Sequence, residues 1–268
     1  MHCVMEEISD INTIHYILLD IAKEFHKVCI NNNIPYYMCY GTMLGAIRHK
    51  GFIPWDDDMD FCIDYQYYDK VIQALKNELP PRYKVLTRND KKGAVGGYLK
   101  IEDTRTILDE GNKLHIDENT GVFVDIFLLY NSRIDLRFKP ILKLIRLLSL
   151  IQSYRFYNKA NIKGYKKWIS YVIRYFFFWL KKDWTINFIE KFLIPKSGNY
   201  FSTYSSIYNS KDIIKRSVYG KPVIYSFENT QLLGVENPDA YLTQIYGDYM
   251  KLPPIEKRRT HIQNVYYQ

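Results

Sequence analysis

The hydrophobic and polar positions of this chain follow two periods, which together predict a sheet packed against helices. Apolar residues recur every three or four positions over residues 8–31 and 67–78, as on one face of a helix, and Pro80 and Pro81 end the second run. Short apolar runs predict strands instead, at residues 36–40, 59–63, 83–87, 97–102, 106–108 and 122–129. The pattern therefore predicts an α+β fold, with a small mixed β-sheet core flanked by helices.

The second half of the chain predicts an insertion followed by a return to the core. Residues 133–196 combine long apolar runs with many basic residues and predict a helical insertion. Residues 223–227 predict a short extended piece, and residues 239–246 a helix. We therefore divide the 268 residues into a core (1–132), a basic, apolar helical insertion (133–196) and a C-terminal part (197–268) that packs back on the core. This length suffices for one enzyme domain with an insertion.

An acidic stretch beside apolar residues is the strongest chemical signal. Residues 41–64 read GTMLGAIRHKGFIPWDDDMDFCID and carry five aspartates, at positions 56, 57, 58, 60 and 64. Adjacent carboxylates repel one another, and burying them requires a neutralising cation. Hard oxygen ligands indicate Mg²⁺ or Mn²⁺. A solvated or calcium-binding loop is the alternative, but an EF-hand starting at Asp56 would have Phe61 and Tyr67 where Gly and Glu are required.

Strand periodicity predicts which of these aspartates share one face. Side chains alternate between the faces of a strand, so Met59 and Phe61 would face a core while Asp58 and Asp60 project side by side from the other face. These two carboxylates could share one or two metal ions. Asp56 lies in line with them and is a further ligand candidate.

The residues before the acids predict a phosphate site. Gly41 lets the backbone turn tightly and approach a ligand. Thr42 could cap a short helix over residues 43–47, whose free amide groups and positive dipole end favour a phosphate.

A third carboxylate lies in a strongly apolar run. Residues 121–130, GVFVDIFLLY, contain a single charge, Asp125. Such an aspartate is costly unless it is paired or bound to a metal. It could complete the metal site from a neighbouring strand; an aspartate that caps a turn or pairs with an arginine is the alternative.

These motifs resemble those of a known family. GTMLGAIRHKGFIPWDDDMD resembles the signature of the LicD family, whose relatives include fukutin and fukutin-related protein. VDIF around Asp125 resembles its second acidic motif, and YGDYMKLPPIEKRRTH, residues 246–261, resembles its closing pattern. The resemblance implies a nucleotidyltransferase-like fold and metal-dependent transfer of an alcohol phosphate, often phosphocholine, from a CDP-linked donor to a sugar hydroxyl.

We therefore expect a LicD-like phosphotransferase. It would move phosphocholine, or a related alcohol phosphate, from CDP-choline or a similar donor to a cell-surface glycan, as in lipopolysaccharide biosynthesis, and release CMP. The glycan is either free or lipid-linked. Mg²⁺ or Mn²⁺ ions held by Asp58, Asp60, Asp125 and Asp56 would clamp the attacking and leaving oxygens. Asp125, or another metal-bound carboxylate, would take the proton of the acceptor hydroxyl.

Two other functions fit parts of the sequence. A nucleotidyltransferase could carry the same Gly-Thr pair and acids, but it would transfer NMP to a small acceptor and release pyrophosphate. A nucleic-acid-binding module would use the basic insertion and bind with steep salt dependence. The basic residues lie among long apolar runs and outside the acidic motif, so we expect no nucleic-acid partner.

Basic residues near the motifs are candidates for binding the donor phosphates, because cations offset the charge that develops in phosphoryl transfer. Arg48 precedes the acids, and Lys100 lies in the strand predicted over residues 97–102. Lys257, Arg258 and His261 lie in the family-like tail. For each of these residues, a solvated basic side chain is the alternative.

The charge distribution singles out the insertion. The chain carries a net charge of +8, yet residues 133–196 alone hold 15 basic and 3 acidic residues. Their longest apolar run, residues 168–180, contains Arg174 and is shorter than the roughly 20 residues that span a bilayer. Two interpretations stay open: an ordinary helical subdomain with basic solvent faces, or interfacial helices that make peripheral contact with anionic lipid.

The remaining features concern location. The four cysteines, at positions 3, 29, 39 and 62, show no C-x-x-C spacing and are expected to be reduced. The first residues, MHCVMEEISD, lack a basic start and an apolar stretch, so we expect no secretory signal. We expect a cytoplasmic protein, either free or at the inner face of the membrane.

Overall fold

The computed structural model describes residues 6–8, 10–88, 90, 98–109, 121–133, 138–156, 164–179, 181, 184–203, 209–258, 260 and 264–267. The helices are α1 (Ile11–Asn31), α2 (Tyr40–Arg48), α3 (Tyr68–Glu78), α4 (Phe138–Phe156), α5 (Tyr165–Phe176), α6 (Trp184–Phe188), α7 (Arg216–Tyr219) and α8 (Pro238–Tyr246), with a π-helix, η3 (Ile189–Leu193), and 3₁₀ turns η1 (Tyr65–Tyr67), η4 (Asn209–Asp212) and η5 (Ile255–Lys257). The strands are β1 (Glu6–Ile8), β2 (Tyr36–Met38), β3 (Asp60–Asp64), β4 (Tyr83–Leu86), β5 (Leu99–Asp103), β6 (Thr106–Asp109), β7 (Phe123–Ser132), β8 (Tyr200–Ser202), β9 (Ile214–Lys215), β10 (Val223–Phe227), β11 (Thr230–Gly234) and β12 (Asn264–Tyr267).

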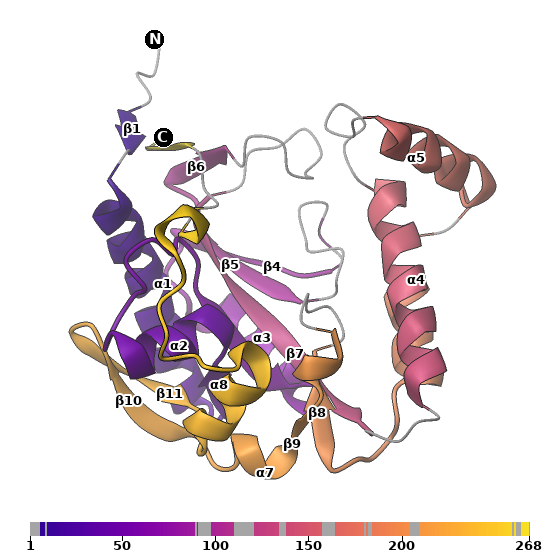
Figure 1. Cartoon of the computed structure of the whole chain (residues 1–268). Coiled ribbons are helices and arrows are strands. Elements are labelled where there is room, and N and C mark those ends of the chain that lie inside the picture. The colour runs from indigo at the N-terminus through magenta and orange to yellow at the C-terminus, as the bar shows by residue number, and fades with distance from the viewer. Residues whose placement is uncertain are drawn as a thin grey trace.

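A mixed sheet forms the centre of the molecule, as predicted (Figure 1). Its strand order is β2-β3-β7-β5-β4, and β8 and β9 extend it beside the end of β7. β3 and β7 run parallel, whereas β7 pairs antiparallel with β5 and β5 with β4. The parallel pair requires a crossover, and the chain between β3 and β7 contains η1, α3, β4, β5 and β6.

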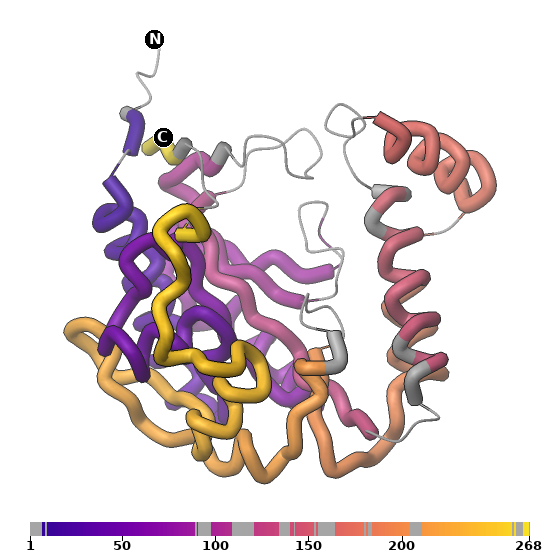
Figure 2. The backbone as a smooth tube through the Cα atoms, in the orientation of Figure 1, coloured from indigo at the N-terminus to yellow at the C-terminus, as the bar shows by residue number. Residues whose placement is uncertain are grey.

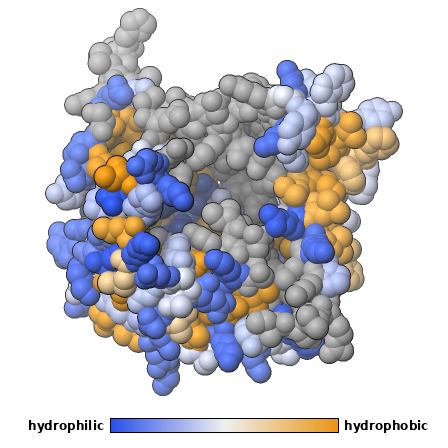
Figure 3. Space-filling model, in the orientation of Figure 1, coloured by the Kyte–Doolittle hydropathy of each residue, from blue (hydrophilic) through white to orange (hydrophobic). Residues whose placement is uncertain are grey.

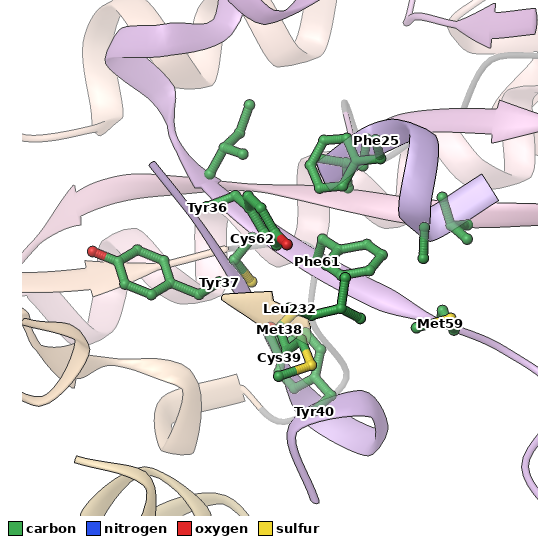
Figure 4. Close-up of a cluster of buried hydrophobic side chains, with 14 of the residues drawn as sticks. Phe25, Tyr36, Tyr37, Met38, Cys39, Tyr40, Met59, Phe61, Cys62 and Leu232 are labelled. Atoms are coloured by element: carbon green, nitrogen blue, oxygen red, sulfur yellow. The ribbon is translucent and has the colours of Figure 1, made fainter. Parts of the chain in front are cut away.

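One face of this sheet packs on α1. The ring of Phe61 in β3 lies 5.0 Å from that of Phe25 in α1 and 5.5 Å from that of Tyr36 in β2 (Figure 4). Because strand side chains alternate, the residues on either side of Phe61 point to the opposite face. One part of the apolar core therefore lies between α1 and the sheet, and Asp60 faces away from that part.

The beginning of α1 shows why this helix forms where it does. The sequence predicts a helix from residue 8, but α1 begins at Ile11. Asp10 is its N-cap residue, and the Asp10 carboxylate accepts a hydrogen bond from the Asn12 backbone N–H. Ile8 instead ends β1, which pairs with β12 near the C-terminus.

Two predictions about strands are wrong. Residues 106–108 do form a strand, β6, but it pairs with β12 in a separate sheet of order β1-β12-β6 and not with the central sheet. Tyr40 does not end a strand: β2 stops at Met38, Cys39 is the N-cap residue, and Tyr40 is the first residue of α2. Both errors concern the spatial partner of a short segment, which local periodicity does not encode.

The C-terminal part packs on the same core. β10 and β11 form a hairpin, of which only β10 was predicted, and the backbone N–H of Leu233 donates to the buried Tyr36 hydroxyl. α8 packs on α2, and the chain after it runs back past α2 (Figure 2). The Arg48 guanidinium fixes this return by donating to the Tyr249 carbonyl at 2.8 Å.

The insertion forms an arm, which we define as α4, α5, α6 and η3. The arm stands beside the sheet, with α4 and α5 as a helical pair at the edge of the molecule (Figure 1). Glu190 of η3 attaches it to the core by accepting hydrogen bonds from Tyr130, Arg88 and Tyr65 at 2.7, 2.7 and 3.1 Å. None of the described helices has the length and hydropathy needed to cross a membrane.

A buried polar cluster holds the junction between β2 and α2. Tyr40 has a φ of 46°, in the left-handed region that costs a non-glycine residue roughly 1 kcal/mol or more. Its hydroxyl donates to Asp212 at 2.8 Å, and its backbone N–H donates to the Tyr241 hydroxyl at 3.2 Å. Burial raises the pKa of Asp212 to about 6, which makes each donor to this carboxylate valuable.

This cluster yields a stability prediction. Tyr40→Phe removes one donor from the buried Asp212 carboxylate without changing the ring, and should lower the free energy of unfolding by about 1–3 kcal/mol. Tyr249→Phe is the matched control, since it removes an exposed tyrosine–aspartate hydrogen bond, to Asp239, and should cost at most about 0.5 kcal/mol. Urea unfolding of both variants measures the difference. Equal midpoints would show that the cluster does not support the junction.

Candidate active site

Three ionisable residues form a row across neighbouring strands of the central sheet. Asp60 of β3 is the direct register partner of Asp125 in the parallel strand β7. Asp125 is in turn the partner of Lys100 in the antiparallel strand β5. Directly paired residues project from the same face of a sheet. Phe61, the neighbour of Asp60, points toward α1. The row therefore lies on the opposite face of the sheet.

Lys100 compensates part of the charge of this row. Its Nζ lies 3.5 Å from Asp125 Oδ1 and 3.2 Å from the centre of the Phe123 ring. The side chain is buried, which decides against the interpretation of Lys100 as a solvent-facing lysine. A cation placed between a carboxylate and an aromatic face stabilises both contacts. One ammonium group nevertheless faces two carboxylates, so the row keeps a negative excess.

Backbone hydrogen bonds fix the position of the two aspartates. The Asp125 N–H donates to the Met59 carbonyl at 3.0 Å, and the Cys39 N–H donates to the Asp60 carbonyl at 3.0 Å. The Asp60 N–H donates to Thr42 Oγ1 at 2.8 Å. The prediction that Thr42 caps a helix over residues 43–47 is therefore wrong: Thr42 lies inside α2, and its hydroxyl ties that helix to the start of β3.

Gly41 makes room for an acid. A Cβ atom at this position would lie 2.6 Å from Asp56 Oδ2, closer than real carbon–oxygen contacts allow. The lack of a side chain thus lets the Asp56 carboxylate approach the first turn of α2. The sequence prediction gave Gly41 a role in ligand approach, and the structure shows that an acidic side chain occupies this space.

His15 of α1 contacts the acidic loop. Its Nε2 lies 2.7 Å from the Asp56 carbonyl oxygen, and its ring stacks on Phe52 at 4.0 Å. This contact connects α1 to the acidic loop, 41 residues along the chain. The sequence gives no local sign of this contact. The apolar spacing of residues 8–31 predicts a helix whether or not residue 15 is a histidine.

The electrostatics of the site reflect crowding of like charges. Burial raises the pKa of Asp60 well above its usual range, and the Asp58, Asp125 and Asp56 carboxylates raise it further, while Lys100 opposes them. Burial, followed by the charges of Asp58 and Asp57, raises the pKa of Asp56 to about 8. Each of these carboxylates thus makes it harder for the next to ionise, unless a cation joins them.

The donor set suits a cation that brings its own ligands. Among the described residues, no three His, Cys, Asp or Glu side chains form a ready-made metal cage. Mg²⁺ seldom uses such a cage, because it is usually held by one or two carboxylates together with waters and substrate phosphates. Asp60 and Asp125 in register, with Asp58 and Asp56 close enough to perturb Asp60, fit that pattern.

Two arginines lie on the α2 side of the acids. Burial lowers the pKa of Arg48, the Arg258 charge lowers it further, and Asp56 opposes both, so the three groups are neighbours. The Arg258 guanidinium lies 4.7 Å from the centre of the Trp55 ring, and its Nε donates to the Pro253 carbonyl. Lys257 is exposed. His261 lies outside the described residues.

Comparison with known proteins identifies the family of this chain. Residues 33–139, which include the row of Asp60, Lys100 and Asp125, match the family described as LicD/FKTN/FKRP, nucleotidyltransferase domain. The chain is 30% identical over 257 residues to the lipopolysaccharide cholinephosphotransferase LicD of Haemophilus influenzae, covering 93% of this chain and 95% of that protein.

Shorter matches concentrate on part of the chain. An uncharacterized protein of Rickettsia typhi is 45% identical over 62 residues, which are 22% of this chain and 20% of that protein. Mannosyltransferase regulator 4 of Saccharomyces cerevisiae is 24% identical over 115 residues, 41% of this chain and 9% of that protein.

The match to the Haemophilus influenzae protein extends over nearly the whole of both chains, beyond the domain that carries the acids. It therefore includes the arm and the C-terminal part as well as the sheet. On this similarity, and on the family match of residues 33–139, the chain belongs to the LicD family.

Proposed function

We propose that this protein is a phosphotransferase that moves phosphocholine from CDP-choline to a hydroxyl group of a lipopolysaccharide or similar surface glycan, with release of CMP. The observation that carries this proposal is the row of Asp60, Asp125 and Lys100 on neighbouring strands, in a chain that resembles a cholinephosphotransferase over almost its full length. The row supplies the acidic centre that transfer of a charged phosphoryl group requires.

The acids would bind Mg²⁺ or Mn²⁺. Asp60 and Asp125 are the central ligand candidates, with Asp58 and Asp56 beside them. When bound, a divalent ion would neutralise charge on the transferring phosphoryl group and on the phosphate of the CMP that leaves. The raised pKa values of Asp60 and Asp56 support this assignment, because like-charged groups held this close favour a cation among them.

The remaining residues of the site bind and orient. Arg48 and Arg258, on the α2 side, offer guanidinium groups to the donor diphosphate, and Trp55 offers an aromatic face next to them. Lys100 holds Asp125 in place and contributes positive charge near the phosphoryl group. Gly41 and Thr42 position Asp56 and Asp60.

The reaction balances in one displacement. The acceptor hydroxyl oxygen forms a new bond to the phosphorus of the phosphocholine group, and the bond from that phosphorus to the bridging oxygen breaks. CMP leaves with the bridging oxygen and its electron pair. A carboxylate of the acidic row, for which Asp125 is the first candidate, accepts the hydroxyl proton.

A nucleotidyltransferase reaction is the second candidate, because the matched domain bears that description. The two reactions differ in the bond that breaks and therefore in their products. Phosphocholine transfer releases CMP, whereas nucleotide transfer from an NTP releases pyrophosphate. Product analysis with CDP-choline and with each NTP, in the presence of Mg²⁺ and a lipopolysaccharide acceptor, separates them. CMP release that requires the acceptor supports the proposal, and pyrophosphate release alone contradicts it.

The acids yield an activity prediction. Asp60→Asn and Asp125→Asn should each lower CMP release by about 10²-fold or more, because each removes a charge that acts on the phosphoryl group. Asp64→Asn is the matched control: Asp64 lies on the same strand and caps η1, a role that an asparagine keeps, so its activity should stay within about threefold of the unmodified protein. Rates with CDP-choline give the comparison. Near-normal rates for Asp60→Asn would rule out its assigned role.

The same site predicts a metal effect that does not depend on turnover. Mg²⁺ should raise the melting temperature, since a ligand that binds the folded state stabilises it. The rise should grow as the pH increases from about 6 to about 9, because protons compete with the cation for Asp56, whose pKa is raised to about 8. Asp60→Asn should weaken the effect and Asp64→Asn should keep it. A shift that is independent of pH and of Asp60 would place the cation elsewhere.

A further inference from the structure

We propose that the arm docks on the surface of an anionic lipid bilayer, with the outer face of α5 embedded at the level of the headgroups. This inference goes beyond the proposed reaction and does not depend on it. It follows from the orientation of one helix, from the charge around it and from a groove at its end.

The helix α5 turns its apolar face outward. Trp168, Tyr171, Val172 and Tyr175 are spaced three and four residues apart and therefore share one face. All four are exposed, Trp168 by 75% and Tyr175 by 76% of their surface. A surface helix of a globular protein normally does the reverse and buries this stripe.

The opposite face of α5 packs on α4 through polar contacts. Ser170 is buried, and its hydroxyl donates to the Tyr154 carbonyl of α4 at 3.2 Å. Arg174 Nε donates to the Ser170 hydroxyl at 3.1 Å. These contacts fix the rotation of α5 about its axis, so the aromatic stripe is held outward by the fold itself.

The stripe belongs to a larger hydrophobic surface on the arm. Figure 3 shows hydrophobic residues gathered over α4 and α5 at the edge of the molecule. Further exposed apolar side chains of the arm and the turn after α5 are Leu144, Leu147, Leu150, Phe178, Trp179 and Phe192. Extended apolar surfaces of this kind mark interaction sites. Tryptophan and tyrosine are the residues enriched where a membrane meets water.

The surrounding charge selects the partner. Exposed cations accompany this surface, namely Lys143, Arg146, Lys166, Lys167, Lys181 and Lys191. Residues 133–196 hold 15 basic and 3 acidic residues. A second copy of the arm would bring like charges together, whereas an anionic bilayer attracts each lysine or arginine near its surface with about 1 kcal/mol. Complementarity therefore favours lipid over self-association.

A groove at the end of the arm fits a lipid headgroup. It has a volume of about 280 Å³ and is lined by Lys181, Trp184, Asn187, Phe188, Lys191 and Phe192. The rings of Trp184 and Phe188 stack at 5.2 Å. Lys191 Nζ lies 5.3 Å from the centre of the Phe192 ring. Two lysines in a groove lined by aromatic rings suit a phosphate joined to an acyl chain.

The arm would lie along the bilayer and not cross it. The 12 residues of α5 span roughly 18 Å, at about 1.5 Å per residue, which is less than the roughly 30 Å of a hydrocarbon core. Glu190 binds Tyr130 of β7, the strand that also carries Asp125. A docked arm would thus set the orientation of the acidic row relative to the membrane.

Flotation of the full-length protein with lipid vesicles tests this proposal without substrate. The protein should float with vesicles of phosphatidylcholine and phosphatidylglycerol, and much less with phosphatidylcholine alone. Trp168→Ser/Tyr175→Ser should weaken binding about tenfold or more, since it removes two interfacial anchors. Tyr16→Ser is the matched control, because Tyr16 is 69% exposed on α1, away from the arm, and its replacement should leave binding unchanged.

Charge reversal separates the electrostatic contribution. Lys166→Glu/Lys167→Glu should abolish the preference for anionic vesicles, whereas Lys70→Glu/Lys84→Glu, which reverses two exposed lysines of α3 and β4, should preserve it. Circular dichroism verifies folding, and light scattering without lipid reports the oligomeric state. The proposal fails if the unmodified protein does not float with anionic vesicles, or if Trp168→Ser/Tyr175→Ser binds them as well as Tyr16→Ser does. It also fails if the protein is a dimer that only Trp168→Ser/Tyr175→Ser converts to monomers.

Discussion

The crowding of negative charge between β3 and β7 is the constraint on which the rest of this structure depends. The parallel register sets Asp60 directly beside Asp125, and the adjacent strand β5 adds Lys100 as a single compensating cation. Burial and neighbouring acids raise the pKa of Asp60 well above its usual range. Apolar residues at these positions would make the folded protein more stable. The row of charges therefore indicates a function other than stability. We propose that binding of a cation and a phosphate is the function of this row.

The residues at the start of α2 place these acids at a cost in local stability. Tyr40 takes up a left-handed conformation so that the chain can pass from β2 into α2 within two residues, and Gly41 leaves room for the Asp56 carboxylate. Thr42 then ties the helix to the backbone of Asp60. The strain at Tyr40 persists because Asp212 and Tyr241 hold the residue from the C-terminal part. The position of Asp60 thus depends on α2 and, through Tyr40, on residues of the C-terminal part.

The sequence predicts those features that follow from local pattern. Strand alternation around Asp60 and the lone charge of residues 121–130 indicate two strands with acids on the polar face, and the mixed sheet confirms the arrangement of these strands. Local pattern does not specify which strands pair, so β6 was assigned to the wrong sheet, and the pairing of β12 with β1 and β6 was missed. The observed contacts of Thr42 and His15 were not predicted for the same reason, because their partners lie 18 and 41 residues away. The roles of the acids in catalysis stay predictions.

The arm shows how one chain can keep an apolar surface outside its core. Its attachment at Glu190 is polar: the carboxylate receives hydrogen bonds from Arg88, Tyr65 and Tyr130, and none of these uses the aromatic stripe of α5. The inner contact of α5 is likewise polar, through Ser170. The arm buries Ile145 and Ile189, but the aromatic stripe of α5 takes no part in these contacts and stays exposed to a partner. Substitutions on the stripe should then alter docking with little effect on the central sheet, a separation that an ordinary amphipathic helix, packed by its apolar face, does not offer.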